Sequence, residues 1–126
     1  EVSQTIKLRH VWASVDVGRV ISPDGVRAQI EGGIIQSASW TLKERVLVED
    51  DGSQVFGWED YPTLPFSEIP QIDISILERN DLPPVGAGEG AQGPTSAAIA
   101  NALYSALGVR VRHLPLTPDE VTRAMQ

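Results

Sequence analysis

A glycine-rich segment between two prolines places the strongest constraint on the fold. Residues 84–94 read Pro-Val-Gly-Ala-Gly-Glu-Gly-Ala-Gln-Gly-Pro, with four glycines in eight positions. Glycine lacks Cβ and weakens helices and strands, so we expect a loop whose backbone approaches a ligand or another chain segment closely. The loop carries one carboxylate, Glu89, and leads directly into a helical sequence.

The helix after this loop is predicted to run through residues 95–107. Pro94 suits its first turn, Gly93 is available as N-cap, and Gly108 is a typical C-terminal stop. Free amides at such a helix start favour an anion or an ionised carboxylate, and Glu89 would lie near them. The pattern alone also fits a plain surface turn, because the loop lacks the lysine of a phosphate loop.

A second helix is predicted from Ser22 to about Lys43. Ser22 is its expected cap and Pro23 its first residue. An apolar band on one face comprises Val26, Ile30, Ile34, Ala38 and Leu42, and a narrow stripe on another face comprises Gly25, Gln29, Gly32 and Gln36. Glycine inside a helix is unfavourable, so Gly32 and Gly33 indicate close approach of something to the backbone. Tight helix packing is the simpler explanation.

Alternating apolar residues predict strands over residues 4–16 and 71–79. A hairpin is expected at 44–57 around the acidic turn 49–53, and a capping box at 117–120 begins a last helix to about Met125. The prediction is an α+β fold in which a short mixed or antiparallel sheet packs against two main helices, with a short C-terminal helix. We expect residues 1–126 to form a single domain.

Composition limits the function. The net charge is −7 and no basic cluster occurs, which argues against nucleic acid or an anionic membrane as partner. The chain contains no cysteine, so it supplies neither an iron–sulfur cluster nor a disulfide. Its two histidines are not at metal-ligand spacing; His10 is expected to be a strand residue, Asp16 a turn residue, and the acidic turn at 49–52 too poor in ligands for calcium.

An ordered set of motifs resembles a known family. The motifs are Gly86-Ala87-Gly88-Glu89, Gly93-Pro94, 98–102, 108–110 and 114–116, preceded by 15–24 and 28–36. In order and spacing they resemble the C-terminal part of the molybdopterin-binding subunit of xanthine dehydrogenase and aldehyde oxidase family enzymes, of the isoquinoline 1-oxidoreductase β-subunit type. Members are several times longer and this sequence begins with Glu1, so we expect a fragment of such a subunit.

The resemblance implies roles for three residues. Glu89 matches the general-base glutamate of the family's Gly-x-Gly-Glu motif, and Gln29 matches a glutamine whose carboxamide hydrogen-bonds the pterin of the molybdenum cofactor. Gly88 belongs to the same cofactor-binding loop. The family's metal has no protein ligands, so none is expected here. After Gln36 the family commonly has glycine, whereas this chain has Ser37, which puts packing on the cofactor side in question.

The implied enzyme oxidises an N-heteroaromatic or aldehyde substrate with oxygen derived from water. Its partners would be the remainder of the subunit, an iron–sulfur small subunit and a small-molecule substrate. We expect the isolated chain to be inactive and without bound cofactor, and exposure of Ala98, Ala102 and Ser105 would favour self-association. The compartment, cytoplasmic or periplasmic, stays open.

Two other functions stay open from the residues. One is a non-catalytic α+β interaction domain that keeps the fold without the chemistry. The other is an anion-binding module at the helix start near Pro94. That module needs basic partners close to the loop, and in the dozen preceding residues the sequence offers only Arg79.

Overall fold

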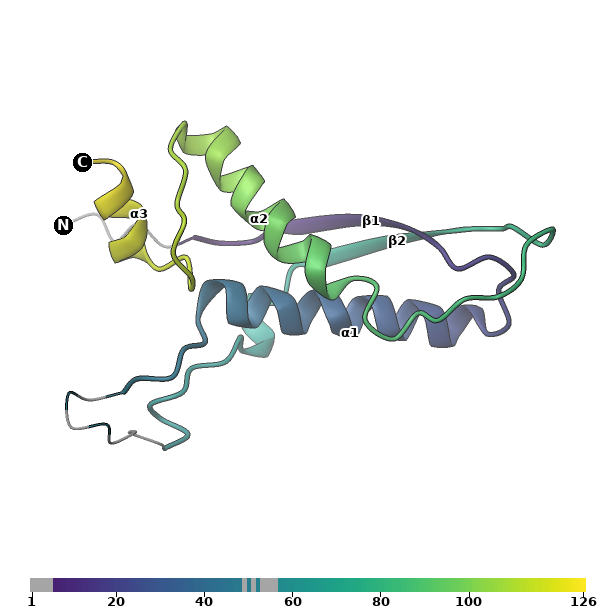
Figure 1. Ribbon diagram of the computed structural model, residues 1–126, viewed down its shortest axis with the longest axis horizontal. Coiled ribbons are helices and arrows are strands. Elements are labelled where there is room, and N and C mark those ends of the chain that lie inside the picture. Colours follow the sequence, from purple (N-terminus) through teal and green to yellow (C-terminus); the bar gives the residue numbers. More distant parts are fainter. Residues whose placement is uncertain (1–5, 49, 51, 53–56) are drawn as a thin grey trace.

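The computed structural model describes residues 6–48, 50, 52 and 57–126. Its elements are the strand β1 (His10–Asp16), the helix α1 (Pro23–Leu42), a short 3-10 helix (Phe66–Glu68), the strand β2 (Gln71–Leu77), and the helices α2 (Gln92–Leu107) and α3 (Pro118–Ala124). Figure 1 shows α1 running beneath the two strands, with α2 crossing above its second half. The predicted α+β class, the two main helices and the short C-terminal helix are confirmed.

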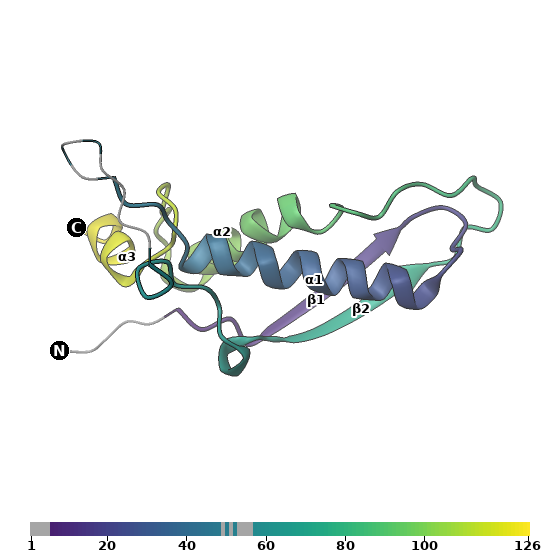
Figure 2. The same cartoon turned by 90° about the horizontal axis from the view of Figure 1, so that it is seen from below.

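The sheet has two strands and is parallel, not mixed or antiparallel as predicted. His10 pairs with Gln71 and the register continues to Asp16 opposite Leu77. The reason lies in the connection between the strands: it contains all of α1, and such a long crossover allows the second strand to run in the same direction as the first. Figure 2 shows α1 lying along one face of this strand pair.

Strand β1 begins at His10, later than predicted, because β2 offers it no partner before Gln71. Pro70 precedes β2 and has no backbone N–H to donate, so pairing starts with the amide of Gln71, which donates to the carbonyl of Arg9 (3.0 Å). Residues 6–9 are outside any strand, and the first residues of the predicted strand lie outside the described part of the chain. Most of the second arm of the predicted hairpin and part of the acidic turn lie outside the described residues, and residues 44–47 of the first arm are in no strand.

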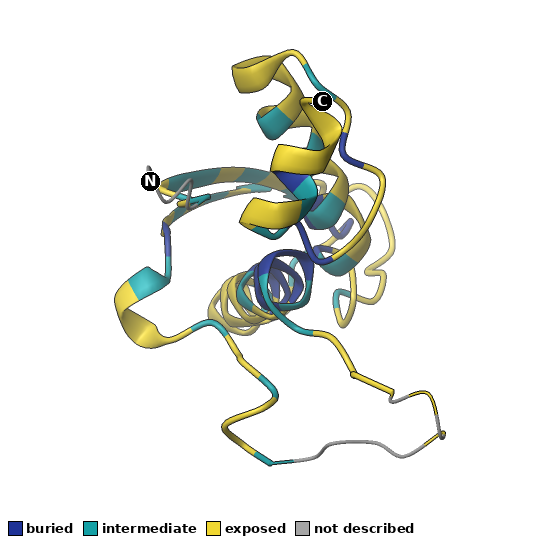
Figure 3. Cartoon of the chain, turned by 90° about the vertical axis from the view of Figure 1, so that its left-hand side faces the viewer, coloured by how far each residue is buried: buried dark blue, intermediate teal, exposed yellow. Residues whose placement is uncertain are grey.

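Helix α1 follows its predicted boundaries. Ser22 accepts a hydrogen bond from the Gly25 amide (3.3 Å), and Pro23 is the first helical residue. The predicted apolar band is turned inward. Its first part contacts the sheet together with Ala91, and its last part joins a second cluster formed with α2, α3 and the segment before α3: Ala38, Leu42, Ile99, Val111, Leu116 and Val121. Figure 3 shows the buried residues of α1 on the side that faces these elements.

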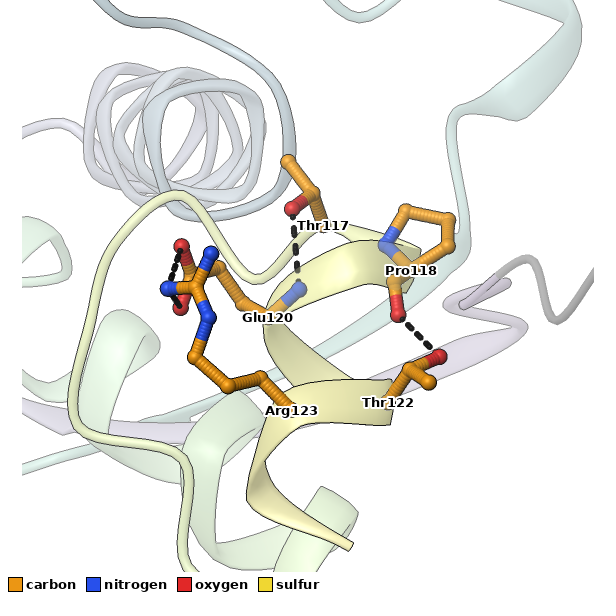
Figure 4. Close-up of polar contacts among 5 residues, drawn as sticks. All are labelled: Thr117, Pro118, Glu120, Thr122 and Arg123. Carbon is orange, nitrogen blue, oxygen red and sulfur yellow. Dashed lines mark hydrogen bonds and ion pairs between the residues drawn. The ribbon is translucent and has the colours of Figure 1, made fainter. Parts of the chain in front are cut away.

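At the start of α3 only one of the two hydrogen bonds of the predicted capping box is formed. The Glu120 amide donates to Thr117 Oγ1 (3.3 Å), as the capping box predicts, but the Glu120 carboxylate pairs with Arg123 (2.8 Å). Figure 4 shows both contacts, together with the hydrogen bond from Thr122 to the Pro118 carbonyl. Upstream, the Leu116 amide donates to the Thr41 carbonyl (2.7 Å), which ties this C-terminal segment to the end of α1.

The connector before β2 exposes aromatic side chains. The side chains of Trp58 and Phe66 are 91% and 94% exposed, so neither belongs to the core of this chain. Tyr61 is half-buried and donates its O–H to Glu44 Oε2 (2.8 Å). This hydrogen bond, together with desolvation and the negative charge of Glu44, raises the pKa of Tyr61 above its usual value of 10.0.

Candidate functional site

The segment from β2 to α2 runs back along the first half of α1 (Figure 1). A hydrogen bond and a close backbone crossing at Gly18 hold its beginning against the end of β1. The Val85 amide donates to the Val17 carbonyl (3.0 Å), and Gly18 adopts a left-handed conformation with φ of +65°. A Cβ on Gly18 would lie 2.1 Å from the Pro83 carbonyl oxygen, so only glycine fits this crossing. Asp16 has the turn role expected, because its carboxylate accepts from the Gly18 amide (2.9 Å).

The same segment meets α1 at two of the predicted cofactor-binding residues. Gln29 Nε2 donates to the Gly88 carbonyl oxygen at 2.7 Å, although 59 residues separate them in the sequence. Gln29 retains its carboxamide oxygen and a second N–H for other partners. A Cβ on Gly88 would meet no atom within 4 Å, so this position is open to a larger partner.

Glu89 follows directly and precedes the first turn of α2. Its side chain is exposed, and its carbonyl accepts from the Gln92 amide at 3.2 Å. Helix α2 begins at Gln92, with Ala91 as N-cap, so it starts slightly earlier than predicted. The reason is that the Thr95 amide and hydroxyl both donate to the Ala91 carbonyl, which closes a first turn made of Gln92, Gly93 and Pro94. Glu89 therefore lies beside the positive end of α2.

Helix α2 is held on α1 by a chain of hydrogen bonds. Trp40 Nε1 donates to Ser96 Oγ (3.2 Å), which also lies 2.6 Å from Thr41 Oγ1 and 3.0 Å from Ser37 Oγ. Ser37 donates to the Gln92 carbonyl (2.8 Å), so its one proton is used. Ser96 must then donate to Ser37, and Thr41 must donate to Ser96. One assignment of protons satisfies every hydroxyl.

Ser37 is therefore part of the interface between α1 and α2. It occupies the place where the resembled family commonly has glycine, and its side chain is fully buried. It donates to the carbonyl of Gln92, the residue whose amide donates to the Glu89 carbonyl. Gln92 also donates from Nε2 to Gln36 Oε1 (2.8 Å). The departure from the family pattern therefore does not disrupt the packing of the loop onto α1 within this chain.

A cavity of about 450 Å³ lies where these elements meet, between the end of β1, the first turns of α1 and the segment 84–88. Gln29, Gly88 and Gly25 line it, together with Ser22 and Arg19. Arg19 was not singled out from the sequence. Its position between the tight turn at Gly18 and the cap of α1 at Ser22 is the signal that could have found it, and in the structure its Nη2 donates to the Asn80 carbonyl (3.2 Å).

The other residues considered as possible metal or anion ligands make contacts outside this cavity. His10 Nε2 lies 2.7 Å from Asp73 Oδ2 across the strand pair, which agrees with a strand role. Arg79 lies 3.6 Å from Asp16 and 3.5 Å from Asp81, so acids from its own neighbourhood already partner the cation that the anion-binding alternative required. Among the described residues, no three His, Cys, Asp or Glu side chains gather as a metal site.

The site therefore combines a glycine loop, a carboxamide and a carboxylate at a helix start. Comparison with known proteins defines the class. Residues 2–70 match the family model described as a molybdopterin cofactor-binding domain. The chain belongs to this family. Gln29 lies within the matched residues, and Gly88 and Glu89 lie after them.

Two named relatives are similar in sequence to most of this chain. The chain is 46% identical over 110 residues to one of the subunits of nicotinate dehydrogenase from Pseudomonas putida, covering 87% of this chain and 9% of the relative. It is 41% identical over 114 residues to the β-subunit of isoquinoline 1-oxidoreductase from Brevundimonas diminuta, covering 90% of this chain and 14% of the relative. The chain thus spans only about a seventh of these relatives or less.

The fold is also found in a solved structure. The crystal structure of quinoline 2-oxidoreductase from Pseudomonas putida 86 superposes on 99% of this chain with a TM-score of 0.85 and 30% identity, using 17% of its own length. The family resemblance drawn from the motifs is thereby confirmed. None of the described helices is long and apolar enough to cross a membrane.

Proposed function

We propose that this chain is a segment of the molybdopterin-binding subunit of a molybdenum hydroxylase. In this proposal Gln29 and Gly88 contribute to the pterin pocket and Glu89 is the general base. The substrate is an N-heteroaromatic compound or an aldehyde. The names of the relatives, which include nicotinate, isoquinoline and quinoline enzymes, support the first of these substrate classes.

The observation that carries the proposal is the hydrogen bond between Gln29 and Gly88. Two residues selected from separate motifs lie 2.7 Å apart, and the residue after Gly88 is the candidate base. A surface turn without function would not require an exposed carboxamide on one helix to fix the backbone of a loop so far along the sequence. The contact supports one site assembled from both motifs.

The residues fit the proposed cofactor chemically. A carboxamide offers both donor and acceptor to the polar edge of a pterin without adding charge. Arg19, in the same cavity, adds a positive charge that suits a phosphate group. With no cysteine in the chain, the metal would be held by the cofactor and not by thiolates of this segment. The bound cofactor would supply the two-electron redox chemistry.

The position of Glu89 suits proton transfer. A general base must come within about 3 Å of the proton that it removes. Glu89 has an exposed side chain on a glycine-rich loop, and its peptide is anchored through Gln92 to the hydrogen-bonded chain between α1 and α2. The side chain is thus free to reach a reactant while its backbone is held.

The complete enzyme needs partners that this chain does not supply. The remainder of the subunit would form the other walls of the pocket, and an iron–sulfur small subunit would carry electrons, since this chain has no cysteine for such clusters. Large exposed side chains such as Trp58 and Phe66 suit burial against these missing parts.

The decisive test is Glu89→Gln in the complete enzyme. Glutamine keeps the size of the side chain and loses its basicity, so we expect kcat to fall by roughly 10² to 10⁴ while molybdenum content is retained. Glu78→Gln, which neutralises an exposed carboxylate after β2, is the matched control and should leave turnover unchanged. Turnover near that of the wild type in Glu89→Gln would remove the catalytic assignment.

A second variant tests the pocket separately from the base. Gln29→Ala removes the carboxamide, and loss of one or two hydrogen bonds should lower cofactor occupancy up to about tenfold when cofactor is limiting. Molybdenum analysis of the purified enzyme measures this. If Gln29→Ala and Glu89→Gln both leave metal content and turnover unchanged, the chain is better described as a non-catalytic interaction domain.

A further inference from the structure

The two edges of the strand pair differ in how their backbone groups are used. The Arg9 carbonyl accepts from the Gln71 amide, so the peptide groups of Arg9 face β2. Successive peptide groups in a strand point to opposite sides, so those of His10, Trp12 and Ser14 point away from β2. Within the described part of the chain, no hydrogen bond to these outward peptide groups is found.

The outer edge of β2 is already capped. By the same alternation the Ile74 carbonyl points away from β1, and Arg27 of α1 donates to it from Nη1 at 2.7 Å. A charged side chain on a strand edge opposes the addition of another strand. The edge of β1 has no such cover among the described residues, so the sheet is open on the β1 side.

A groove runs along this open edge. It has a volume of about 470 Å³, and its walls are β1 on one side and α2 on the other, with α1 as floor. The wall on α2 is made of Pro94, Ala98 and Ala102, and the floor includes Ile34. No Cα atom of α2 lies within 8 Å of a Cα atom of β1, which leaves room for a strand at the usual spacing of about 4.8 Å.

We propose that an extended segment from the remainder of the molybdopterin-binding subunit pairs with the outer edge of β1 and becomes the third strand of this sheet. The inference rests on the proposed function only in requiring that the chain be part of a longer subunit. The relatives support this source, because 86–91% of their length lies outside the region matched here, as follows from coverages of 14% and 9%.

The outward backbone groups along the groove favour an extended segment as its occupant. A row of outward N–H and C=O groups about every 7 Å is satisfied by an extended backbone and not by a helix, whose own peptide groups are paired internally. The small side chains of α2 allow a strand to lie close, and its alternate residues would be apolar where they meet Ile34 and Ala98. Trp12, 73% exposed here, would gain a neighbour.

Hydrogen exchange in the complete molybdenum-containing enzyme, resolved to single amides by mass spectrometry, tests the pairing. We expect the outward amides of His10, Trp12 and Ser14 to exchange roughly 100-fold or more slowly than unprotected peptide, as do the inward amides of Val11 and Ala13. Fast exchange of the outward amides beside slow exchange of the inward ones, in an enzyme that turns over, would overturn the third strand and leave the proposed function intact.

A pair of substitutions separates the backbone donor from the side chain. Ser14→Pro removes an outward N–H without touching the β1–β2 ladder, whereas Ser14→Ala removes the hydroxyl and keeps the N–H. In the complete enzyme Ser14→Pro should raise exchange at Trp12 at least about tenfold or lower the melting temperature by several degrees, and Ser14→Ala should do neither. Equal behaviour of the two variants would contradict the proposal.

Photo-cross-linking identifies the occupant. With p-benzoylphenylalanine in place of Trp12, the cross-linked peptide should come from the remainder of the same subunit. A cross-link to the same segment of a second copy would replace the proposal by self-association along β1. Native mass spectrometry that finds a free-standing chain of this size would instead contradict the proposed function as well, so the two failures are told apart.

Discussion

The residues on the two faces of α1 are present for different reasons. On the inner face, Ile30, Ile34, Ser37 and Thr41 are buried, and their contacts lie within this chain. On the outer stripe, Gly25, Gln29, Gly32 and Gln36 are exposed. The inner face therefore accounts for the fold of the chain. The outer stripe has two glycines and two carboxamides, and each carboxamide makes one exposed hydrogen bond to the segment that folds back over α1, from Gln29 to the Gly88 carbonyl and from Gln92 to Gln36.

This difference separates stability from function along one helix. Substitutions on the inner face should change the free energy of unfolding, because they remove packing or hydrogen bonds. Substitutions on the outer stripe should change that free energy by about 1 kcal/mol or less, because they remove at most one exposed hydrogen bond or add helix propensity, and they should act mainly on the cofactor. The experiment on Gln29 examines the second half of this statement, two further pairs of variants examine the first, and a pair of adjacent glycines compares the two faces.

The largest expected effect on unfolding is that of Ile34→Ala. Ile34 is 1% exposed between α1 and the sheet, and its truncation leaves a cavity, so the free energy of unfolding should fall by about 2–5 kcal/mol. Ile21→Ala is the matched control, since Ile21 is 74% exposed and should change the same quantity by less than about 0.5 kcal/mol. Urea denaturation measures both. Similar losses for the two variants would mean that Ile34 on the inner face does not belong to the core.

The next effect is that of Ser37→Ala. It removes the donor to the Gln92 carbonyl and the acceptor for Ser96, so we expect a loss of roughly 1–3 kcal/mol in the free energy of unfolding. Ser105→Ala, on α2 at an exposed position, should be neutral or slightly stabilising because alanine favours helices. If both variants unfold alike in urea, the hydrogen-bonded chain does not hold α2 in place.

Local signals were read correctly from the sequence. The cap at Ser22, the stop at Gly108 and the apolar band of α1 follow from residue chemistry and helical period, and of the capping box predicted at 117–120 the Thr117 half is formed. The α+β class follows because the sequence combines two short strand patterns with two long helical patterns, and such a small sheet must pack against the helices. Such features depend on neighbours in the sequence, which is why one chain without relatives suffices to predict them.

Contacts between distant residues were harder to predict. The sheet direction was wrong because period and propensity do not report which way a paired strand runs, and the crossover through α1 decides it. Burial of Ser37 and the place of Arg19 in the cavity depend on how α2 and the segment after Gly18 fold back. The assembly of Gln29 with Gly88 was expected only from the resemblance, and their assigned roles stay predictions.

The smallest effects distinguish two adjacent glycines that the sequence treats alike. A Cβ on Gly33 would lie 3.3 Å from the Ala91 Cβ, whereas one on Gly32 would meet nothing within 4 Å. Gly32→Ala should therefore stabilise the chain by up to about 1 kcal/mol through helix propensity. In Gly33→Ala that gain is opposed by crowding against the buried start of α2, so the variant should be less stable than Gly32→Ala by about 1 kcal/mol or more.

Urea denaturation of both variants measures the free energy of unfolding. Molybdenum content of the complete enzyme carrying each variant measures cofactor occupancy. Gly32 lies one turn from Gln29 on the outer stripe, so a methyl group there should lower cofactor occupancy even though it stabilises the helix. Gly33→Ala should perturb stability first. Equal stabilities would mean that Ala91 does not crowd position 33. Full molybdenum content in Gly32→Ala would mean that the outer stripe does not face the cofactor and that its glycines serve a contact with another part of the subunit.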